Sequence, residues 1–211
     1  MWGVCGERLA VVYNGFTAPA ITESREVLKE KLEMRGYPII SIGRLVPWKG
    51  FDVLIEAMTE VVKKIPSARL TIIGDGPERI SLEKKIGELG LGASVMILGK
   101  KPQRELFEYL TASDAFVLNT AYEGFSHQIL EAMALSVPVI TTPEGGNPEI
   151  VIDHNNGLVV PYNDRRAIQD AIIALYEDAV LAKKLTTNAQ KKVGEFNNER
   201  MLSALTEVLL K

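Results

Sequence analysis

Residues 39–73 read IISIGRLVPWKGFDVLIEAMTEVVKKIPSARLTII, and this stretch decides the fold. Its two ends, Ile39–Ile42 and Leu70–Ile73, are short runs rich in β-branched residues, which are typical of strands. Between them Phe51–Ile65 carries apolar side chains at helical spacing. That apolar stripe consists of Val53, Leu54, Ala57, Met58, Val61 and Val62. Strand, helix and strand with short loops predict a right-handed crossover that joins two parallel strands.

The same alternation continues along the chain in both directions. Further strands are expected at Ala10–Tyr13, Val95–Leu98, Ala115–Leu118, Val137–Thr141 and Leu158–Val160. Further helices are expected at Glu23–Arg35, Glu78–Leu89, Gln103–Thr111, His127–Leu135, Arg165–Tyr176, Val180–Phe196 and Glu199–Leu210. Several strands are apolar throughout, as expected when helices cover both faces of a parallel sheet. We therefore predict an α/β protein with a doubly wound parallel sheet, whose ligands bind beyond the carboxyl ends of the strands.

The composition excludes some classes of function. Among 211 residues, 46% are hydrophobic and 24% are charged, which is ordinary for a globular protein. The net charge of -3 provides no basic field, so we expect no nucleic-acid partner. The single cysteine, Cys5, cannot form an intramolecular disulfide. No apolar run is long enough to span a bilayer, and the amino terminus does not resemble a signal peptide. We expect a cytoplasmic protein, with peripheral contact to the inner face of the membrane left open.

A first candidate site is the loop Gly43–Gly50, which lies between a predicted strand and a predicted helix. It carries Arg44 and Lys49 around a tight turn. Arg can bind two phosphate oxygens at once, and Lys can place a point charge beside them. The helix after Gly50 points its free N–H groups in the same direction. The alternative is a turn whose two cations are merely solvated.

The second and more informative candidate is the segment from Glu123 to Glu131, which follows the strand Ala115–Leu118. Ser126 can cap a helix that begins near His127, and the free N–H groups there suit an anion. Glu131 lies about one turn inside that helix, where its two oxygens could accept hydrogen bonds from neighbouring hydroxyls. On the loop, Glu123 could hold hydroxyls of a sugar. The alternative is a capped helix with two acidic neighbours and no ligand.

Three other features carry weaker signals. Residues 73–78 (IGDGPE) contain Gly-x-Gly without a full dinucleotide fingerprint, and we interpret them as a turn with Pro77 at the first helical position. Residues 141–149 (TTPEGGNPE) predict a short helix with Asn147 as its cap and Pro148 at its first position, and its N–H groups could alternatively meet a ligand. The histidines, His127 and His154, have no catalytic or metal-ligand partner pattern, so we expect no metal site.

Taken in order, these segments resemble the C-terminal domain of retaining GT-B glycosyltransferases of family 4, the glycosyl transferases group 1. Each match is weak alone, but the ordered set is specific and extends from about Leu9 to about Leu205. The matching stretches are 13–15 (YNG), 41–50 (SIGRLVPWKG), 70–78 (LTIIGDGPE), 123–125 (EGF), 130–134 (LEAMA), 138–140 (PVI), 145–149 (GGNPE) and 157–161 (GLVVP).

The resemblance implies a Rossmann-like lobe that binds a nucleoside-diphosphate sugar and transfers a hexose with retention. It implies three segments: a linker and first strand (1–21), the nucleotide-sugar-binding domain (22–196) and a C-terminal helix (197–211). The implied catalytic residues are Arg44, Lys49 and Glu123, of which the two cations bind the donor diphosphate and support its departure without a metal. The other implied donor-binding residues are Gly43, Gly99 and Lys100 near the base, Gly124, Phe125, Ser126 and His127 through their backbone, and Glu131 on the ribose.

Two residues depart from the pattern of this family. Ser126 stands where a second glycine is usual, and its side chain would crowd the sugar or add a hydroxyl contact. Ser136 replaces a glycine at a helix end, where glycine is preferred.

The resemblance also implies an absent partner, because members of this family hold the acceptor in a separate N-terminal lobe. We expect that lobe in the same chain or in another one, contacting the membrane if any part does. A cleft with one wall cannot exclude water, so we expect weakened donor binding and little transfer by this chain alone. The alternatives are a non-catalytic subunit that binds a nucleotide sugar for a partner and, less favoured, a nucleotide-sugar epimerase.

Overall fold

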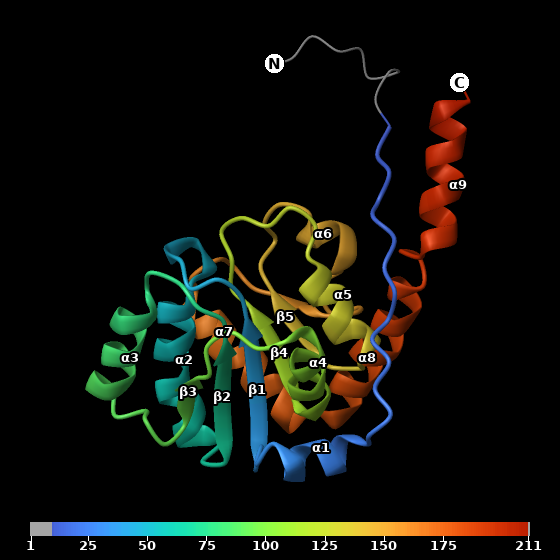
Figure 1. Ribbon diagram of the computed structural model, residues 1–211. Helices are drawn as coiled ribbons and strands as arrows, with labels where there is room; N and C mark the ends of the chain where they lie inside the picture. The colour runs from blue at the N-terminus through green and yellow to red at the C-terminus, as the bar shows by residue number, and fades with distance from the viewer. Residues whose placement is uncertain (1–9, 211) are drawn as a thin grey trace.

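The computed structural model describes residues 10–210 and contains one parallel sheet with helices on both of its faces (Figure 1). The strands lie in the order β3-β2-β1-β4-β5-β6, the order of a doubly wound nucleotide-binding sheet. Their bounds are β1 Tyr37–Ile42, β2 Ala68–Ile73, β3 Val95–Ile97, β4 Ala115–Leu118, β5 Val139–Thr141 and β6 Leu158–Val159. The predicted fold class is thereby confirmed.

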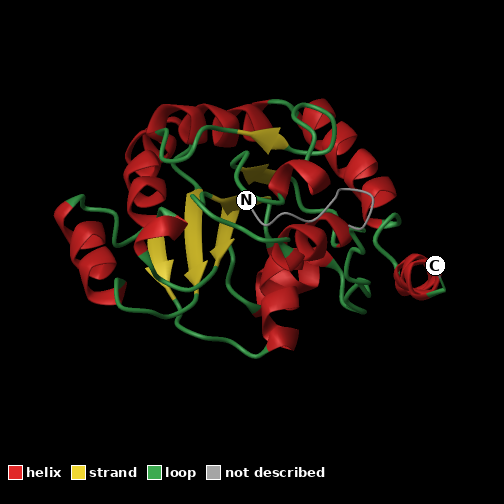
Figure 2. Ribbon diagram, turned by 90° about the horizontal axis from the view of Figure 1, so that it is seen from above, coloured by secondary structure: helices red, strands yellow, loops and turns green. Residues whose placement is uncertain are grey.

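Alternation of side chains along the strands divides the core into two layers. In β1, Ile39 belongs to one buried cluster and Ile40 to the other, and Ile72 and Ile73 divide in the same way in β2. Because successive residues of a strand point to opposite faces, each face needs a covering layer of helices. The view from above shows helices around the strands (Figure 2).

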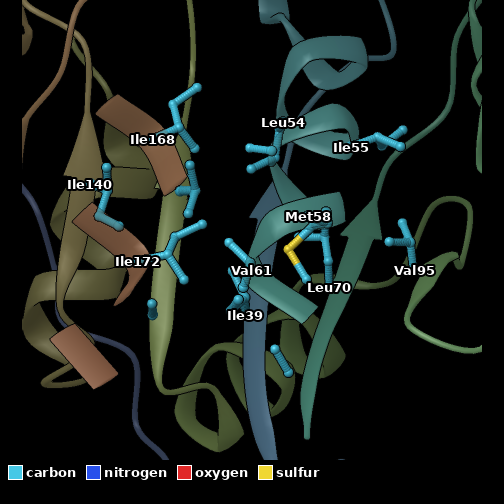
Figure 3. Packing of buried hydrophobic residues seen from close by; sticks show 14 of the residues in the cluster. Ile39, Leu54, Ile55, Met58, Val61, Leu70, Val95, Ile140, Ile168 and Ile172 are labelled. Carbon is cyan, nitrogen blue, oxygen red and sulfur yellow. The ribbon is translucent and has the colours of Figure 1, made fainter. Parts of the chain in front are cut away.

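One face is covered mainly by α2 (Phe51–Lys64), α3 (Arg79–Glu88) and α7 (Arg165–Glu177). Four of the six residues of the predicted α2 stripe are buried, Val53 and Val62 are partly buried, and Phe51 and Ile55 are buried in addition. Leu54, Met58 and Val61 lie over Ile39 and Leu70 (Figure 3). The other face is covered by α4 (Gln103–Ala112), α5 (His127–Ala134) and α8 (Ala179–Val193). The remaining helical elements are α1 (Arg25–Lys31), the 3-10 turn η2 (Pro47–Lys49), α6 (Asn147–Ile150) and α9 (Asn198–Leu209).

The predicted strand at Ala10–Tyr13 is wrong. This segment has no sheet partner and runs beside α8 and α9 (Figure 1). The residues that follow it contact the C-terminal part of the chain: Phe16 N–H donates to Phe196 O at 2.7 Å, and Gly15 N–H lies 3.1 Å from Met201 Sδ. Its β-branched residues have strand propensity, but a strand also needs a free sheet edge beside it. Residues 1–9 of the predicted linker lie outside the described residues.

Helix ends differ slightly from the predicted ones, for local reasons. The helix expected at Glu23–Arg35 is shorter, because Ser24 caps its start and Glu33, with φ of 54°, leaves the helical conformation. At the other end of the chain, α9 has no buried residue and projects from the domain (Figure 1). Among the described residues, no helix is both long and apolar enough to cross a membrane.

Candidate functional site

A cleft of about 670 Å³ opens at the carboxyl edge of the sheet. It lies where the chain reverses its direction of winding, since β1 is flanked by β2 on one side and β4 on the other. Doubly wound sheets bind ligands at such a switch point. The sequence predicted a site beyond the carboxyl ends of the strands, and the cleft lies at that edge. The cleft is lined by Ile42, Gly43, Arg44, Ile73, Gly74, Asp75, Gly76, Lys100, Lys101, Leu106 and Gln128.

Arg44 stands in the wall of this cleft with its side chain exposed. Within residues 10–210, its guanidinium has no hydrogen bond or ion pair to another residue. Five donors of fixed geometry are therefore free to meet an anion in the cleft. The preceding Gly43 also lines the wall, next to Gly74 of the neighbouring strand end.

Lys49 lies in η2, at the other end of the same loop, and is held differently. Its Nζ donates to Glu123 Oε2 at 2.5 Å, and the two side chains are only 14% and 20% exposed. The pair joins loops that are 74 residues apart in the sequence, because β1 and β4 are neighbours in the sheet. The structure thus brings together two of the predicted catalytic residues, which lie beside the cleft and do not line its wall.

The loop that carries Glu123 rests on the glycines of the next loop. Gly146 N–H donates to Glu123 O at 3.0 Å. A Cβ on Gly145 would lie 1.7 Å from Glu123 O, and one on Gly146 would lie 1.9 Å from Gly124 O. Any larger residue would displace the Glu123 loop. The sequence indicated a capped helix or a ligand-facing turn here, and this supporting role was not predicted.

That short helix, α6, also begins one residue earlier than predicted. Gly146 is its N-cap, so Asn147 occupies the first helical position instead of the cap. The Asn147 side chain is fully buried and donates to Thr141 Oγ1 and Thr142 O, both at 3.1 Å. These two bonds draw the amide into the β5 end and away from the capping position. Residues 73–78 differ in the opposite direction, since α3 begins at Arg79, two residues after Pro77, the predicted first helical position.

The start of α5 was predicted correctly. Ser126 is the N-cap and its Oγ accepts from Ile129 N–H at 3.4 Å. The serine is 2% exposed, so its hydroxyl turns into the protein to cap the helix. The side chain of Ser126, which stands at a usual glycine position, therefore caps the helix. The exposed backbone at Gly124, where a Cβ would meet nothing within 4 Å, and the exposed His127 leave the helix start open to a ligand.

The side chain of Phe125 belongs to an aromatic cluster. Its ring lies 5.4 Å from that of Tyr13 and 5.2 Å from that of Phe196, measured between centroids. The cluster fixes the Glu123–Ser126 loop against both the N-terminal segment and the end of α8. Only the backbone of Phe125 is therefore available for the donor-binding role that the resemblance implies.

Glu131 lies one turn inside α5 and is half-buried. Within the described residues, its carboxylate has no hydrogen-bond partner, and burial raises its pKa to about 6. Gln128 stands three residues earlier, on the same face of the helix, and lines the cleft. The sequence analysis missed Gln128, although its spacing of three from Glu131 was a usable signal.

Most of the remaining cleft residues come from the ends of β2 and β3, while Ile42 ends β1 and Leu106 belongs to α4. Lys100 lines the wall as predicted, and Gly99 precedes it with φ of 75°. We interpreted Gly74–Gly76 as a structural turn, and a Cβ on Gly74 would indeed lie 1.7 Å from Gly43 O. The same residues nevertheless line the cleft, so that interpretation was incomplete. No group of three or more His, Cys, Asp or Glu residues that could hold a metal occurs between residues 10 and 210.

The sequence matches a known family over the part of the chain that builds this cleft. Residues 24–192 match the family model of the glycosyl transferases group 1. The chain belongs to this family. Over 172 residues it is 33% identical to the lipopolysaccharide core biosynthesis glycosyltransferase LpsE of Rhizobium meliloti, which covers 81% of this chain and 49% of that protein. This glycosyltransferase chain therefore spans about half the length of that relative.

Solved glycosyltransferase structures share its fold. The structure of HepE from Anabaena in complex with UDP superposes with a TM-score of 0.84 at 26% identity, covering 95% of this chain and 57% of HepE. The C-terminal domain of a group 1 glycosyl transferase, LpcC from Francisella tularensis, matches with a TM-score of 0.75 at 29% identity. That match covers 87% of this chain and 94% of the solved domain. The fold is therefore one Rossmann-like lobe of the GT-B type, as predicted.

Proposed function

We propose that this chain is the donor-binding lobe of a retaining hexosyltransferase that uses a nucleoside-diphosphate sugar. One observation carries the proposal: a cleft at the switch point has a free Arg44 in its wall and the Lys49–Glu123 pair beside it. The open start of α5 supplies N–H groups at the same edge of the sheet. Fixed cations and a helix N-terminus are the groups that bind phosphates.

In this proposal the donor lies across the cleft from its base to its sugar. The base rests near Lys100, the ribose hydroxyls donate to Glu131, and the diphosphate meets Arg44 and the start of α5. Glu123 accepts hydrogen bonds from the transferred sugar. Support comes from HepE, whose structure was solved in complex with UDP and matches 95% of the residues of this chain.

The proposed reaction needs positive charge beside the departing diphosphate. When the glycosidic bond breaks, negative charge grows on the departing diphosphate, and preorganised cations stabilise that charge most effectively. Arg44 and Lys49 supply it from the protein, so we propose that transfer is independent of a metal. Unchanged transfer by the whole enzyme in the presence of EDTA is the expected result.

The acceptor needs a second wall. Because this chain spans about half the length of LpsE, we propose that the acceptor site lies on another lobe, in the same protein or a partner. The lobe alone should bind the donor but transfer little, since water is not excluded from an open cleft.

A thermal-shift experiment tests the proposal on the 211-residue chain. Saturating UDP, GDP or ADP, at about 100 times Kd, should stabilise the protein by about 2.7 kcal/mol and raise Tm by several degrees. Lys49→Ala and Glu131→Ala should each abolish the rise. Lys64→Ala serves as the matched control, because Lys64 is 60% exposed at the far end of α2. The proposal fails if none of the three nucleotides shifts the wild-type Tm.

A further inference from the structure

The turn that carries Lys49 is fastened by the residues that follow β4. Ala121 N–H donates to Trp48 O at 2.8 Å. Thr120 Oγ1 lies 3.3 Å from the same oxygen, but its shorter hydrogen bond, at 2.8 Å, goes to Tyr122 O. On the other side of the lysine, Asn119 Nδ2 donates to Gly50 O at 2.9 Å. The backbone carbonyls on both sides of Lys49 are therefore held mainly by Asn119 and Ala121 of another loop.

Asn119 is the most constrained of these three residues. It is 2% exposed, and all of its amide groups are used. Besides the bond to Gly50, its Nδ2 donates to Asn163 Oδ1 at 2.8 Å, and its Oδ1 accepts from Asn163 N–H at 3.0 Å. Buried polar networks of this kind rigidify their surroundings when every member is satisfied.

Gly50 fits this arrangement closely. Its φ is 52°, and a Cβ at this position would lie 2.2 Å from Asn119 Nδ2. The turn after Lys49 thus combines a left-handed backbone with close approach of the asparagine, and both require glycine. The contact between Asn119 and Gly50 therefore leaves no room for a side chain at position 50.

The loop that fastens the turn also supplies the partner of Lys49. Asn119 and Ala121 hold the backbone on either side of the lysine, and Glu123, two residues after Ala121, accepts from its Nζ at 2.5 Å. We propose that Asn119 is a positioning residue that fixes Lys49 at the cleft before the donor arrives. The inference rests on the proposed function for its role in diphosphate binding, but the positioning of Lys49 can be measured without any nucleotide.

The nucleotide test compares UDP with uridine by calorimetry. Because Lys49 meets only the diphosphate, Asn119→Ala should weaken UDP about tenfold and leave uridine unchanged. In a Lys49→Ala background, Asn119→Ala should cause no further loss, since the group that it positions is gone. Equal weakening of UDP and uridine, or a full tenfold loss in the double variant, would overturn the inference.

Asn156→Ala is the matched control. Asn156 is also 2% exposed, its Nδ2 donates to Ile150 O at 2.9 Å, and its Oδ1 accepts from Ile152 N–H at 2.7 Å. It braces a loop away from the cleft, so Asn156→Ala should lower Tm by a similar amount without changing UDP affinity. A UDP loss in Asn156→Ala equal to that in Asn119→Ala would show that general loosening is the cause.

A second readout needs no nucleotide. The reactivity of Lys49 toward an amine-acetylating reagent, followed by mass spectrometry of the labelled peptide, reports how firmly its amine is held against Glu123. Asn119→Ala should increase Lys49 labelling several-fold, and Asn156→Ala should not. If wild-type protein binds no nucleotide but Lys49 labelling rises in Asn119→Ala, the proposed function fails and the positioning inference stands. Unchanged labelling overturns the inference.

Thr120→Val guards against a variant that does not fold. It keeps the branched shape and volume while removing the hydroxyl, which bonds Tyr122 O at 2.8 Å within the same loop and lies 3.3 Å from Trp48 O. Its effects on UDP affinity and on Lys49 labelling should have the same direction as those of Asn119→Ala and be smaller, about twofold. If Asn119→Ala cannot be purified folded, and Thr120→Val changes neither UDP affinity nor Lys49 labelling, the result counts against the inference.

Discussion

Arg44 and Lys49 stand at the two ends of one loop, five residues apart, yet the structure treats them oppositely. Arg44 is exposed in the wall of the cleft and makes no ion pair within the described residues. Lys49 is 14% exposed, paired with Glu123 and set in a turn whose carbonyls are held by the β4–α5 loop. One cation is ready for an anion, and the other already has one.

The difference indicates separate tasks. A free, solvated arginine attracts a diphosphate and gains modest energy from it, because water and salt screen the charge. A preordered lysine loses little conformational freedom on binding and can place its charge accurately where negative charge develops. Glu123, the partner of Lys49, must then share the lysine with the diphosphate. Substitutions at Arg44 and at Lys49 should therefore change UDP affinity by different amounts.

The largest effect should follow from Lys49→Ala. This change removes a cation and leaves Glu123 uncompensated beside the expected diphosphate, so we expect UDP affinity to fall about 100-fold or more. Calorimetry with wild-type protein and with Lys64→Ala as control measures the loss. A loss below about tenfold would mean that Lys49 serves Glu123 and not the donor.

Arg44→Ala should have a smaller, salt-sensitive effect. We expect about a tenfold loss of UDP affinity at low ionic strength and a smaller loss at 0.5 M NaCl, because exposed charges are screened. Arg35→Ala is the control, since Arg35 is also exposed but precedes β1, at the opposite edge of the sheet. A loss that does not depend on salt would place Arg44 in a buried contact with the donor.

Glu123→Gln should act in the opposite direction. It frees Lys49 from its ion pair and removes a negative charge near the diphosphate, so UDP affinity should rise about threefold. Lys49→Ala, which removes the other member of the pair, should lower UDP affinity. The decisive result is therefore whether Glu123→Gln raises or lowers UDP affinity. Weaker UDP binding by Glu123→Gln would show that the ion pair orients Lys49 more than it competes for it.

The smallest effect concerns stability and the carboxylate of Glu131. Burial raises its pKa to about 6, so the folded protein binds this proton more tightly than the unfolded chain, whose glutamate has its ordinary pKa. The folded state therefore bears the cost of a desolvated charge above about pH 6, and this cost disappears as the pH falls toward 4.5.

Glu131→Gln should thus raise Tm by about 2 °C at pH 7.5 and leave it unchanged near pH 4.5. Thermal scans across this pH range measure the difference, with Glu60→Gln, a change of an exposed carboxylate, as control. The same variant should bind UDP more weakly, because an amide accepts fewer hydrogen bonds from ribose hydroxyls. A Tm gain that persists at pH 4.5 would contradict burial as its cause.

Features that depend on a few neighbouring residues were predicted well. The serine cap of α5 and the position of Glu131 follow from helix geometry alone, and both are confirmed. Ser136, predicted at a glycine position, indeed has φ of 60°. The strand at Ala10–Tyr13 was predicted wrongly because a strand also depends on a sheet neighbour that is distant in the sequence. Local propensity cannot tell whether a sheet edge is available.

Most of the missed site residues have a role that depends on a distant loop, and Gln128 is the exception. Asn119 follows an all-apolar strand, which indicated a polar group at the end of that strand. The sequence did not indicate that this asparagine binds Gly50 and Asn163. Gln128 could have been found from its spacing to Glu131. Gly145 and Gly146 were visible as a turn, whereas their contact with the Glu123 loop depends on β4 and β5 lying side by side.

By itself, the sequence determined the parallel α/β sheet, the loops that carry its ligand groups and the capped start of α5, because strand and helix periodicity and capping are set within a few residues. Only the tertiary structure decided that Lys49 is paired and fastened while Arg44 is free. That distinction arises because the strand order places β1 beside β4, which brings residues 119–123 against a turn about 70 positions earlier in the chain.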